Sequence, residues 1–404
     1  MSLVRPSRRP FFDLNWVVFA VIVAIIGIGL LNLRNADYYS ADSFHQRQLK
    51  WYLVGTVLAV IVAFVDLHFI SRLAYVIYGV TIAMLIAVLF TNPINGSTRW
   101  LPIPGLGESL QPAEFAKIGL ILALARFFQD GYRDLRPDDG RLMRIIRPAL
   151  PFALIAPSVY LIFIEPDLGT SLITLFCGLS IVFYEGLRWR SVLNAIVLVA
   201  IVIPVGWKWG MHDYQRDRVM AWLYPEEIEA KVTETRQALK QNPDDVAVKK
   251  HLEELEETLA KTYQPEQAQK AIGSGGFYGK GGQQGQASRQ KSLPYLHTDF
   301  VVACYGEERG FAGGFVLLCL YYLLTYWAMK VTKHARDRFQ VLSCVGVAGL
   351  IFWQFFVNVG MVTGLLPVVG VTLPLLSYGG SSVLTICIGL GVCFNIAFRR
   401  RATG

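Results

Sequence analysis

Long runs of apolar residues, separated by short polar stretches, recur along the whole chain. Ten of them approach or reach the roughly 20 residues that a helix needs to cross a bilayer. They are Trp16–Leu31, Tyr52–Phe64, Ala74–Phe90, Phe115–Phe128, Ala149–Ile164, Leu172–Phe183, Val192–Val205, Phe311–Ala328, Val341–Val357 and Val383–Phe398. The shorter runs need their flanking residues to complete a span. The pattern predicts an all-α, polytopic membrane protein of about ten transmembrane helices.

The distribution of lysine and arginine predicts the orientation of these helices. With the N-terminus in the cytoplasm, the inside segments hold 18 of these residues, and the short outside loops hold 4, namely Arg34, Arg47, Lys50 and Arg99. Cytoplasmic loops carry the positive excess in membrane proteins, so both termini are expected inside. The same bias accounts for the formal net charge of +8 without a nucleic-acid partner.

Composition supports a membrane protein and limits its chemistry. Of the 404 residues, 53% are hydrophobic and only 17% are charged, which is too little charge to cover a soluble protein of this length. The six cysteines lie in or beside apolar runs without metal-ligand spacing, so we interpret them as small buried hydrophobes rather than disulfides.

Two polar stretches interrupt the apolar pattern. Residues 91–111 form a Gly- and Pro-rich outside loop, and residues 208–298 form a long extracytoplasmic loop between the seventh and eighth spans. Within the longer loop, Glu226–Lys261 is expected to be a charged helical hairpin, an insert with ten acidic and six basic residues. A solvated hairpin is the plain interpretation, and a docking surface for a partner is the alternative. A glycine-rich stretch, Ala271–Phe300, follows; its backbone is expected to approach a ligand closely, and it has no Walker spacing.

Asp299 is the first candidate for chemistry, because it lies where the long loop re-enters the membrane. As a carboxylate at the membrane rim it can accept a proton from a hydroxyl group as a general base. Thr298 or Asp299 can also serve as the N-cap of the eighth helix, and the two roles are compatible.

Glu114 and Lys117 are the second candidates. Pro112 suits a first helical turn, which places Glu114 and Lys117 one turn apart on the same face. Lys117 then lies inside an apolar run, where ionisable residues usually face a cavity or a partner. The alternative is a structural pair whose charges neutralise each other.

Further polar groups are expected on the same side of the membrane. Arg99 can hold a phosphate and Trp100 can stack on a sugar ring, although Trp100 also suits an interfacial anchor. Arg216 and Arg218 add two cations at the outer end of the seventh segment. Ser377 begins a run of small polar residues that either packs helices or lines a cavity. This set suits a phosphorylated, lipid-anchored substrate, handled by an enzyme or moved by a carrier.

At these residues the chain resembles the shape, elongation, division and sporulation family, which includes the RodA and FtsW proteins. The resemblance covers nearly the whole chain and favours the RodA branch. It rests on the segments GSTRWLPIPGLGESLQPAEFAK (Gly96–Lys117), EPDLGT (Glu165–Thr170), YQRDR (Tyr214–Arg218), AIGSGGFYGKG (Ala271–Gly281), HTDF (His297–Phe300) and NVGMVTGLLPVVGVTLPLLSYGGSS (Asn358–Ser382).

The resemblance implies an inverting peptidoglycan glycosyltransferase. Such an enzyme joins lipid II units by β-1,4 bonds outside the bacterial cytoplasmic (inner) membrane and releases undecaprenyl pyrophosphate. Asp299 would take the proton of the acceptor hydroxyl, and Glu114 and Lys117 match an important pair of the fourth helix. The candidate substrate-binding residues are Arg99, Trp100, Gln111, Arg216, Arg218, Lys280, His297 and Ser377.

The expected partners are a class B penicillin-binding protein, which supplies the transpeptidase, and other membrane proteins of the elongation complex. A divalent cation, Mg or Mn, is suggested by the pyrophosphate chemistry, although no Asp-x-Asp motif occurs. Two departures from the family pattern stand out: the hairpin insert, and the continuation of HTDF as VVACYGEERG. The alternative functions are a lipid II translocase and a noncatalytic scaffold.

Overall fold

The computed structural model describes residues 16–37, 43–91, 98–102, 109–130, 149–186, 224–241, 246–285 and 297–399. In chain order the elements are α1 (Trp16–Asp37), α2 (Phe44–Phe64), α3 (Leu67–Val88), β1 (Leu101–Pro102), β2 (Ser109–Leu110), α4 (Pro112–Gln129), α6 (Leu150–Ile164), α7 (Leu168–Tyr184), α10 (Pro225–Gln241), α11 (Val246–Ser274), α13 (Val301–Val331), the 3-10 helix η4 (Thr332–His334), α14 (Arg338–Val362) and α15 (Gly380–Phe398). Helices dominate, as the sequence predicts.

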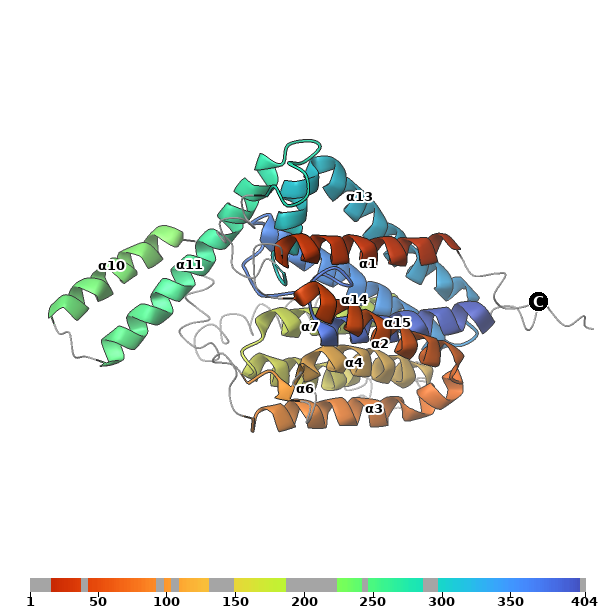
Figure 1. Cartoon of the computed structure of the whole chain (residues 1–404). Helices are drawn as coiled ribbons and strands as arrows, with labels where there is room; N and C mark the ends of the chain where they lie inside the picture. The colour runs from red at the N-terminus through yellow and green to blue at the C-terminus, as the bar shows by residue number, and fades with distance from the viewer. Residues whose placement is uncertain are drawn as a thin grey trace, which may run out of the picture.

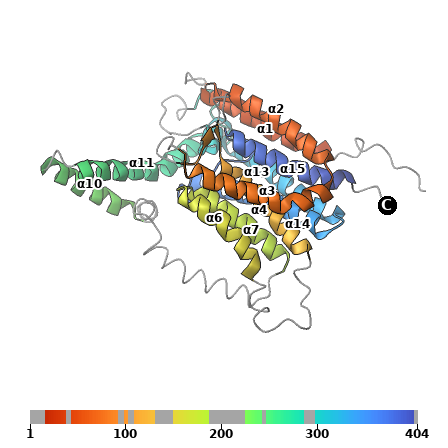
Figure 2. The same cartoon turned by 90° about the horizontal axis from the view of Figure 1, so that it is seen from below.

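The apolar helices form a bundle (Figures 1 and 2). Within the described ranges, six helices (α1, α2, α3, the α13–η4 unit, α14 and α15) are long and apolar enough to cross a membrane, and α6 and α7 are shorter apolar helices. Helix α4 also lies in the bundle, although it carries Glu114, Lys117 and Arg126. The expected run Val192–Val205 falls outside the described residues. The expected all-α polytopic architecture agrees with the structure.

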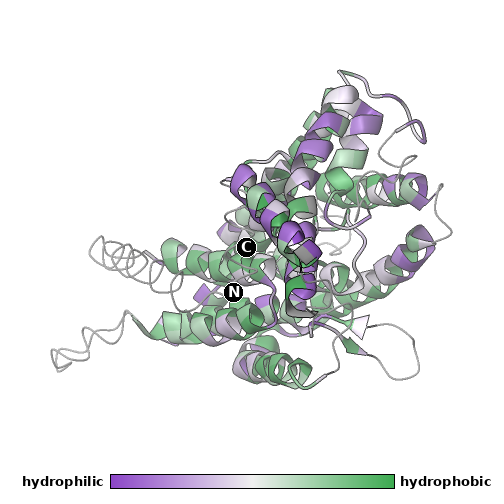
Figure 3. Cartoon of the chain, turned by 90° about the vertical axis from the view of Figure 1, so that its left-hand side faces the viewer, coloured by the Kyte–Doolittle hydropathy of each residue, from purple (hydrophilic) through white to green (hydrophobic). Residues whose placement is uncertain are grey.

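The bundle has two distinct ends. At the hairpin end, α1 finishes at Asp37, α4 begins at Pro112, and α10 and α11 project beyond the bundle (Figure 1). At the terminal end, α1 begins at Trp16 and α15 finishes at Phe398. Figure 3 shows apolar colouring along the bundle helices and mostly polar colouring on the projecting hairpin.

Helix α4 lies at the centre of the bundle, and small residues allow its neighbours to approach closely. Most of its side chains are buried, including Lys117. A Cβ atom at Gly346 of α14 would lie only 2.4 Å from Ile121 of α4, and a Cβ atom at Gly389 of α15 would lie 3.4 Å from Ile118. Such close packing holds the residues of α4 in one position relative to α14 and α15.

Helices α10 and α11 pack against each other through Ile228, Val232, Leu252 and Leu255. The buried apolar side chains of this insert are therefore used within the hairpin itself. The expected boundary at Lys261 differs from the structure, because α11 continues through Pro265 to Ser274. The turn at residues 242–245 lies outside the described ranges.

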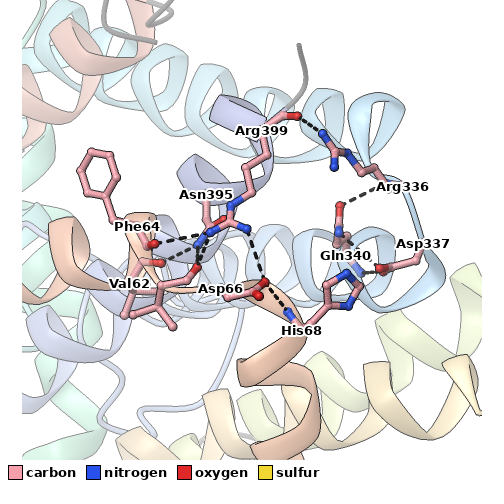
Figure 4. Close-up of polar contacts among 10 residues, drawn as sticks. Val62, Phe64, Asp66, His68, Arg336, Asp337, Gln340, Asn395 and Arg399 are labelled. Carbon is pink, nitrogen blue, oxygen red and sulfur yellow. Dashed lines mark hydrogen bonds and ion pairs between the residues drawn. The ribbon is translucent and has the colours of Figure 1, made fainter. Parts of the chain in front are cut away.

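The terminal end is closed by polar contacts between α2, α3, α14 and α15 (Figure 4). Asn395 donates hydrogen bonds to the carbonyl oxygens of Val62 and Val65, at 2.7 and 2.6 Å. Arg399 donates to the Val65 carbonyl at 2.9 Å and pairs with Asp66 at 3.4 Å. These contacts satisfy carbonyl groups that the end of α2 leaves without helical partners.

Candidate functional site

Asp299 lies in the turn His297–Phe300, directly before α13. Three hydrogen bonds, all accepted by its backbone carbonyls, hold this turn. Asn358 of α14 donates to the Asp299 carbonyl at 2.9 Å, Ser377 donates through its hydroxyl to the Thr298 carbonyl at 2.6 Å, and the Tyr378 amide donates to the His297 carbonyl at 2.8 Å. The N-cap of α13 is Phe300, without a side-chain cap, so the capping role considered for Asp299 is not what the structure shows.

A buried, non-helical segment faces this turn. We call residues 363–379, between α14 and α15, the site loop. Its residues Val371, Leu373, Leu375 and Leu376 are buried although they are not helical. Side chains from distant helices bind its carbonyls: Tyr52 donates to Leu375 at 2.8 Å, and Tyr321 donates to Pro374. Irregular backbone at the level of a membrane is tolerated where protein covers it in this way.

The Asp299 carboxylate faces the backbone of the site loop. A Cβ atom at Gly370 would lie 3.5 Å from Asp299 Oδ2, and Gly370 itself has a positive φ of 72°. Burial is the main cause that raises the pKa of Asp299 to about 6, and the negative charge of Asp167 raises it further. A hydrogen bond from Thr298 and the positive charge of Arg99 act in the opposite direction. A carboxyl group with this pKa suits proton transfer near neutral pH.

Asp167 and Glu165 bring two more carboxyl groups to the same end. Asp167 caps α7 by accepting from the Thr170 amide at 3.1 Å, and Gln111 donates to it at 2.7 Å. The Glu165 carboxylate is fully buried, and neither of its oxygens has a hydrogen-bond partner in the described part of the chain. Burial, followed by the charge of Asp167, raises the pKa of Glu165 to about 8.

Arg99 joins the outside loop to this acidic turn. Its Nε atom donates to the Glu165 carbonyl at 2.9 Å, and its Nη2 atom donates to the Pro166 carbonyl. Arg99 therefore positions the turn through backbone contacts, and its charge also acts on Asp299. Trp100, next along the chain, is partly exposed, and β1 then pairs with β2 in an antiparallel ribbon that the sequence did not indicate.

Glu114 and Lys117 form a buried ion pair in α4. The Lys117 Nζ atom lies 2.8 Å from Glu114 Oε1, and the side chains are only 1% and 6% exposed. The second oxygen, Glu114 Oε2, has no hydrogen-bond partner among the described residues. Gln111, one turn before Glu114, links α4 to α15, because its backbone N–H donates to the Ser381 hydroxyl at 2.9 Å. The two buried charges compensate each other, so removing either partner would leave the other charge buried and unpaired.

The remaining substrate-binding residues predicted from the sequence have different surroundings in the structure. The His297 ring stacks on Phe44 of α2 at 4.1 Å, and the Ser377 hydroxyl also accepts from the Leu373 amide at 2.8 Å. Lys280 pairs instead with Glu307 of α13 at 2.7 Å. Arg216 and Arg218 lie outside the described residues.

Sequence reasoning missed several residues that shape the site. Glu165 and Asp167 are visible in the sequence as a tight turn with two carboxylates, but nothing local indicates that the charge of Asp167 acts on Asp299. Asn358 reads as one polar residue in an apolar run, yet it is fully buried and bridges the Asp299 and Val371 carbonyls. An isolated amide within a spanning segment is the signal that could have identified it.

Comparison with known proteins identifies the family. The family profile described as "Cell cycle protein", which comprises FtsW, RodA and SpoVE, matches residues 13–241 and 242–402. The chain belongs to this family. The match includes the residues gathered around Asp299 at the hairpin end.

Curated relatives from the same family match along nearly their entire length. Peptidoglycan glycosyltransferase MrdB of Escherichia coli (strain K12) is 33% identical over 401 residues, covering 98% of both chains. The probable peptidoglycan glycosyltransferase FtsW of Trichlorobacter lovleyi is 30% identical, covering 98% of this chain and 95% of the relative. The expected enzyme class, a glycosyltransferase, is confirmed.

Two solved structures have the same fold. A chain from a study of the structural coordination of polymerization and crosslinking by a peptidoglycan synthase complex is 30% identical, with a TM-score of 0.73 over 96% of this chain and 98% of that one. The rod shape determining protein RodA of Thermus thermophilus is 28% identical, with a TM-score of 0.64 over 96% and 98%. The all-α polytopic fold is confirmed.

Proposed function

We propose that this glycosyltransferase polymerises lipid II into β-1,4-linked glycan strands at the outer side of the bacterial cytoplasmic membrane. The name of the MrdB relatives supports peptidoglycan as the product, and the RodA likeness supports a role in elongation. The excess of lysine and arginine in the segments of the terminal end supports an outward-facing hairpin end. The site at the hairpin end then lies where the wall is built.

Asp299 acts as the general base of the reaction. The 4-hydroxyl oxygen of the acceptor sugar attacks the anomeric carbon of the donor, and the bond from that carbon to the pyrophosphate oxygen breaks. The pyrophosphate leaves with the bonding electrons, the hydroxyl proton passes to Asp299, and the configuration inverts. The observation that carries this assignment is the carboxyl group of Asp299, which faces the site loop at Gly370 and has a pKa of about 6.

Cationic groups stabilise the negative charge that develops on the leaving pyrophosphate. Lys117, paired with Glu114, supplies a buried charge that does not reorganise during the reaction. Arg99 contributes its charge while its backbone contacts hold the acidic turn. Arg216 and Arg218 remain proposed contacts to the pyrophosphate.

A divalent cation, Mg or Mn, remains a proposal derived from the pyrophosphate chemistry. The described part of the chain contains no group of three or more His, Cys, Asp or Glu side chains that could hold such an ion. We therefore assign no protein ligands to it and derive no step through it.

A class B penicillin-binding protein is the proposed partner, together with other membrane proteins of the elongation complex. The support is the solved relative, whose study concerns a complex that coordinates polymerization and crosslinking. A partner with transpeptidase activity would crosslink the strands that this enzyme makes.

The test is polymerisation of labelled lipid II by the purified protein with its penicillin-binding partner. Wild type should make glycan strands, and Asp299→Asn should make none while it remains folded. Asp130→Asn is the matched control, because this carboxylate lies at the terminal end and pairs with Arg126 at 2.9 Å. Equal polymer from Asp299→Asn would refute the base assignment. Transbilayer movement of lipid II without polymer from wild type would favour a translocase.

A further inference from the structure

Helix α13 is interrupted at Gly310. This residue has φ 67° and ψ −165°, a backbone conformation that glycine adopts at far lower cost than other residues. The interruption divides α13 into an outer segment, residues 301–309, and an inner segment, residues 311–331. The outer segment begins two residues after Asp299, so its position determines where that carboxylate lies.

The glycine loop, residues 275–285, supplies the backbone hydrogen bonds that the interruption removes. In a continuous helix the amides of Phe311 and Ala312 would donate to the carbonyls of Glu307 and Glu308. Here these amides donate instead to Gly276 and Phe277 of the loop, at 2.9 and 3.0 Å. The two freed carbonyls are bound by loop amides in turn.

Those loop amides belong to Lys280 and Gly281, which donate to Glu307 and Glu308 at 3.0 and 3.1 Å. The approach is so close that a Cβ atom at Gly279 would lie 2.1 Å from the Glu308 carbonyl oxygen. The glycines expected from the sequence to approach a ligand therefore approach the backbone of α13.

Side chains strengthen the same junction. The Lys280 Nζ atom lies 2.7 Å from Glu307 Oε1, with Lys280 26% exposed and Glu307 only 2% exposed. Glu308 accepts from Asn35 of α1 at 2.6 Å and from the Gln283 amide at 3.1 Å. A largely buried carboxylate needs such a partner, so loss of the Lys280 cation would release the Glu307 side chain from its place.

We infer that Lys280 and Glu307 are a positioning pair for the polymerisation reaction, which locks the outer segment of α13 to the glycine loop and so holds Asp299 against the site loop. The inference rests on the proposed role of Asp299 as the base. The sequence predicted that Lys280 contacts the substrate; here Lys280 acts instead by holding α13 in position. The pair touches neither the acceptor sugar nor the pyrophosphate.

The test measures kcat and KM for lipid II with the full-length protein and its partner. Lys280→Met and Glu307→Gln should each lower kcat roughly tenfold or more, because small displacements of a catalytic group are costly, and KM should stay near the wild-type value. The double variant should be no slower than the slower single variant, and Lys280→Arg should retain most of the rate. Lys270→Met is the matched control, since Lys270 forms an exposed ion pair with Glu266 of α11 at 2.6 Å.

The outcomes separate this inference from the proposed function. A higher KM with unchanged kcat in Lys280→Met alone would overturn the inference and indicate a substrate contact. Wild-type kinetics in both single variants, with Asp299→Asn inactive in the same assay, would overturn the inference and leave the proposed function standing. Activity of Asp299→Asn equal to wild type would overturn both.

Discussion

The two ends of the bundle carry polar groups in opposite ways. At the terminal end the ion pair of Arg399 with Asp66 is shallow, with side chains 41% and 58% exposed, and Asp66 also caps α3. At the hairpin end Glu114, Lys117 and Glu165 are buried, and backbone with positive φ replaces helix. The charges of the Arg399–Asp66 pair thus stay near water, while the hairpin end retains unfavourable buried charges and left-handed backbone. Such features persist where function requires them.

The largest expected difference between the ends concerns the buried pair of α4. Lys117→Met leaves Glu114 buried without its partner, which should lower the free energy of unfolding by about 3–5 kcal/mol. Thermal unfolding in detergent would measure the loss. The double variant Glu114→Gln, Lys117→Met should recover part of it, because no charge is then left unpaired. A single variant as stable as wild type would show that the pair is more hydrated than the structure indicates.

The pH dependence of polymerisation should also depend on the hairpin end. Asp299 must be deprotonated to act, so the rate should fall as the pH decreases through about 6, the raised pKa of this group. Asp167→Asn removes the negative charge that raises this pKa and keeps a residue able to cap α7. The midpoint of the pH–rate profile should therefore move to lower pH, because the positive charge of Arg99 continues to lower the pKa of Asp299. A pH–rate profile of both proteins measures the shift, and an unmoved or higher midpoint would contradict the coupling.

A much smaller effect is expected at the terminal end. Arg399→Ala removes an exposed ion pair and hydrogen bonds to carbonyls at the end of α2, and it should cost no more than about 1 kcal/mol of stability. The rate of polymerisation should stay unchanged. Parallel unfolding and activity measurements provide the comparison with Lys117→Met. A loss similar to that of Lys117→Met would remove the distinction between the two ends.

The smallest effect on the rate is expected from the projecting hairpin. Replacing residues 226–261 with a short flexible linker removes the cluster in which α10 packs on α11. The remaining part of α11 keeps its own contact to the site loop, since Gln269 donates to the Thr363 carbonyl at 2.7 Å. The deletion should spare kcat. If a folded deletion variant lost polymerisation, the hairpin would be part of the catalytic apparatus.

The sequence predicted the helices and Asp299 because both leave local signals. A long apolar run indicates a span, and the HTDF segment resembles a family motif. The interruption of α13 leaves no such signal, because Gly310 is one of several glycines and its positive φ depends on the glycine loop packed against it. The partner of Lys280 was equally hidden, since Glu307 lies 27 residues further along the chain.

Burial was the other property that local reasoning could not supply. Glu165 looks like one of two carboxylates in an exposed turn, yet it has no exposed surface. Its surroundings come from elements distant in the chain. A Cβ atom at Gly169, in the first turn of α7, would lie 2.4 Å from the Val369 carbonyl of the site loop. Only the assembled bundle brings these two segments together.

The hydrogen bonds of the site loop also bear on biogenesis. Its carbonyls are bound by Tyr52 of α2, which enters the membrane early, and by Tyr321 of α13, which enters late. Gln48 of α2 likewise donates to the Ser377 carbonyl at 2.9 Å, across most of the chain. A nascent chain that has exposed its aspartate but not yet inserted α15 lacks a complete reaction centre. Catalytic competence therefore arises only after α15 has inserted and packed against α2.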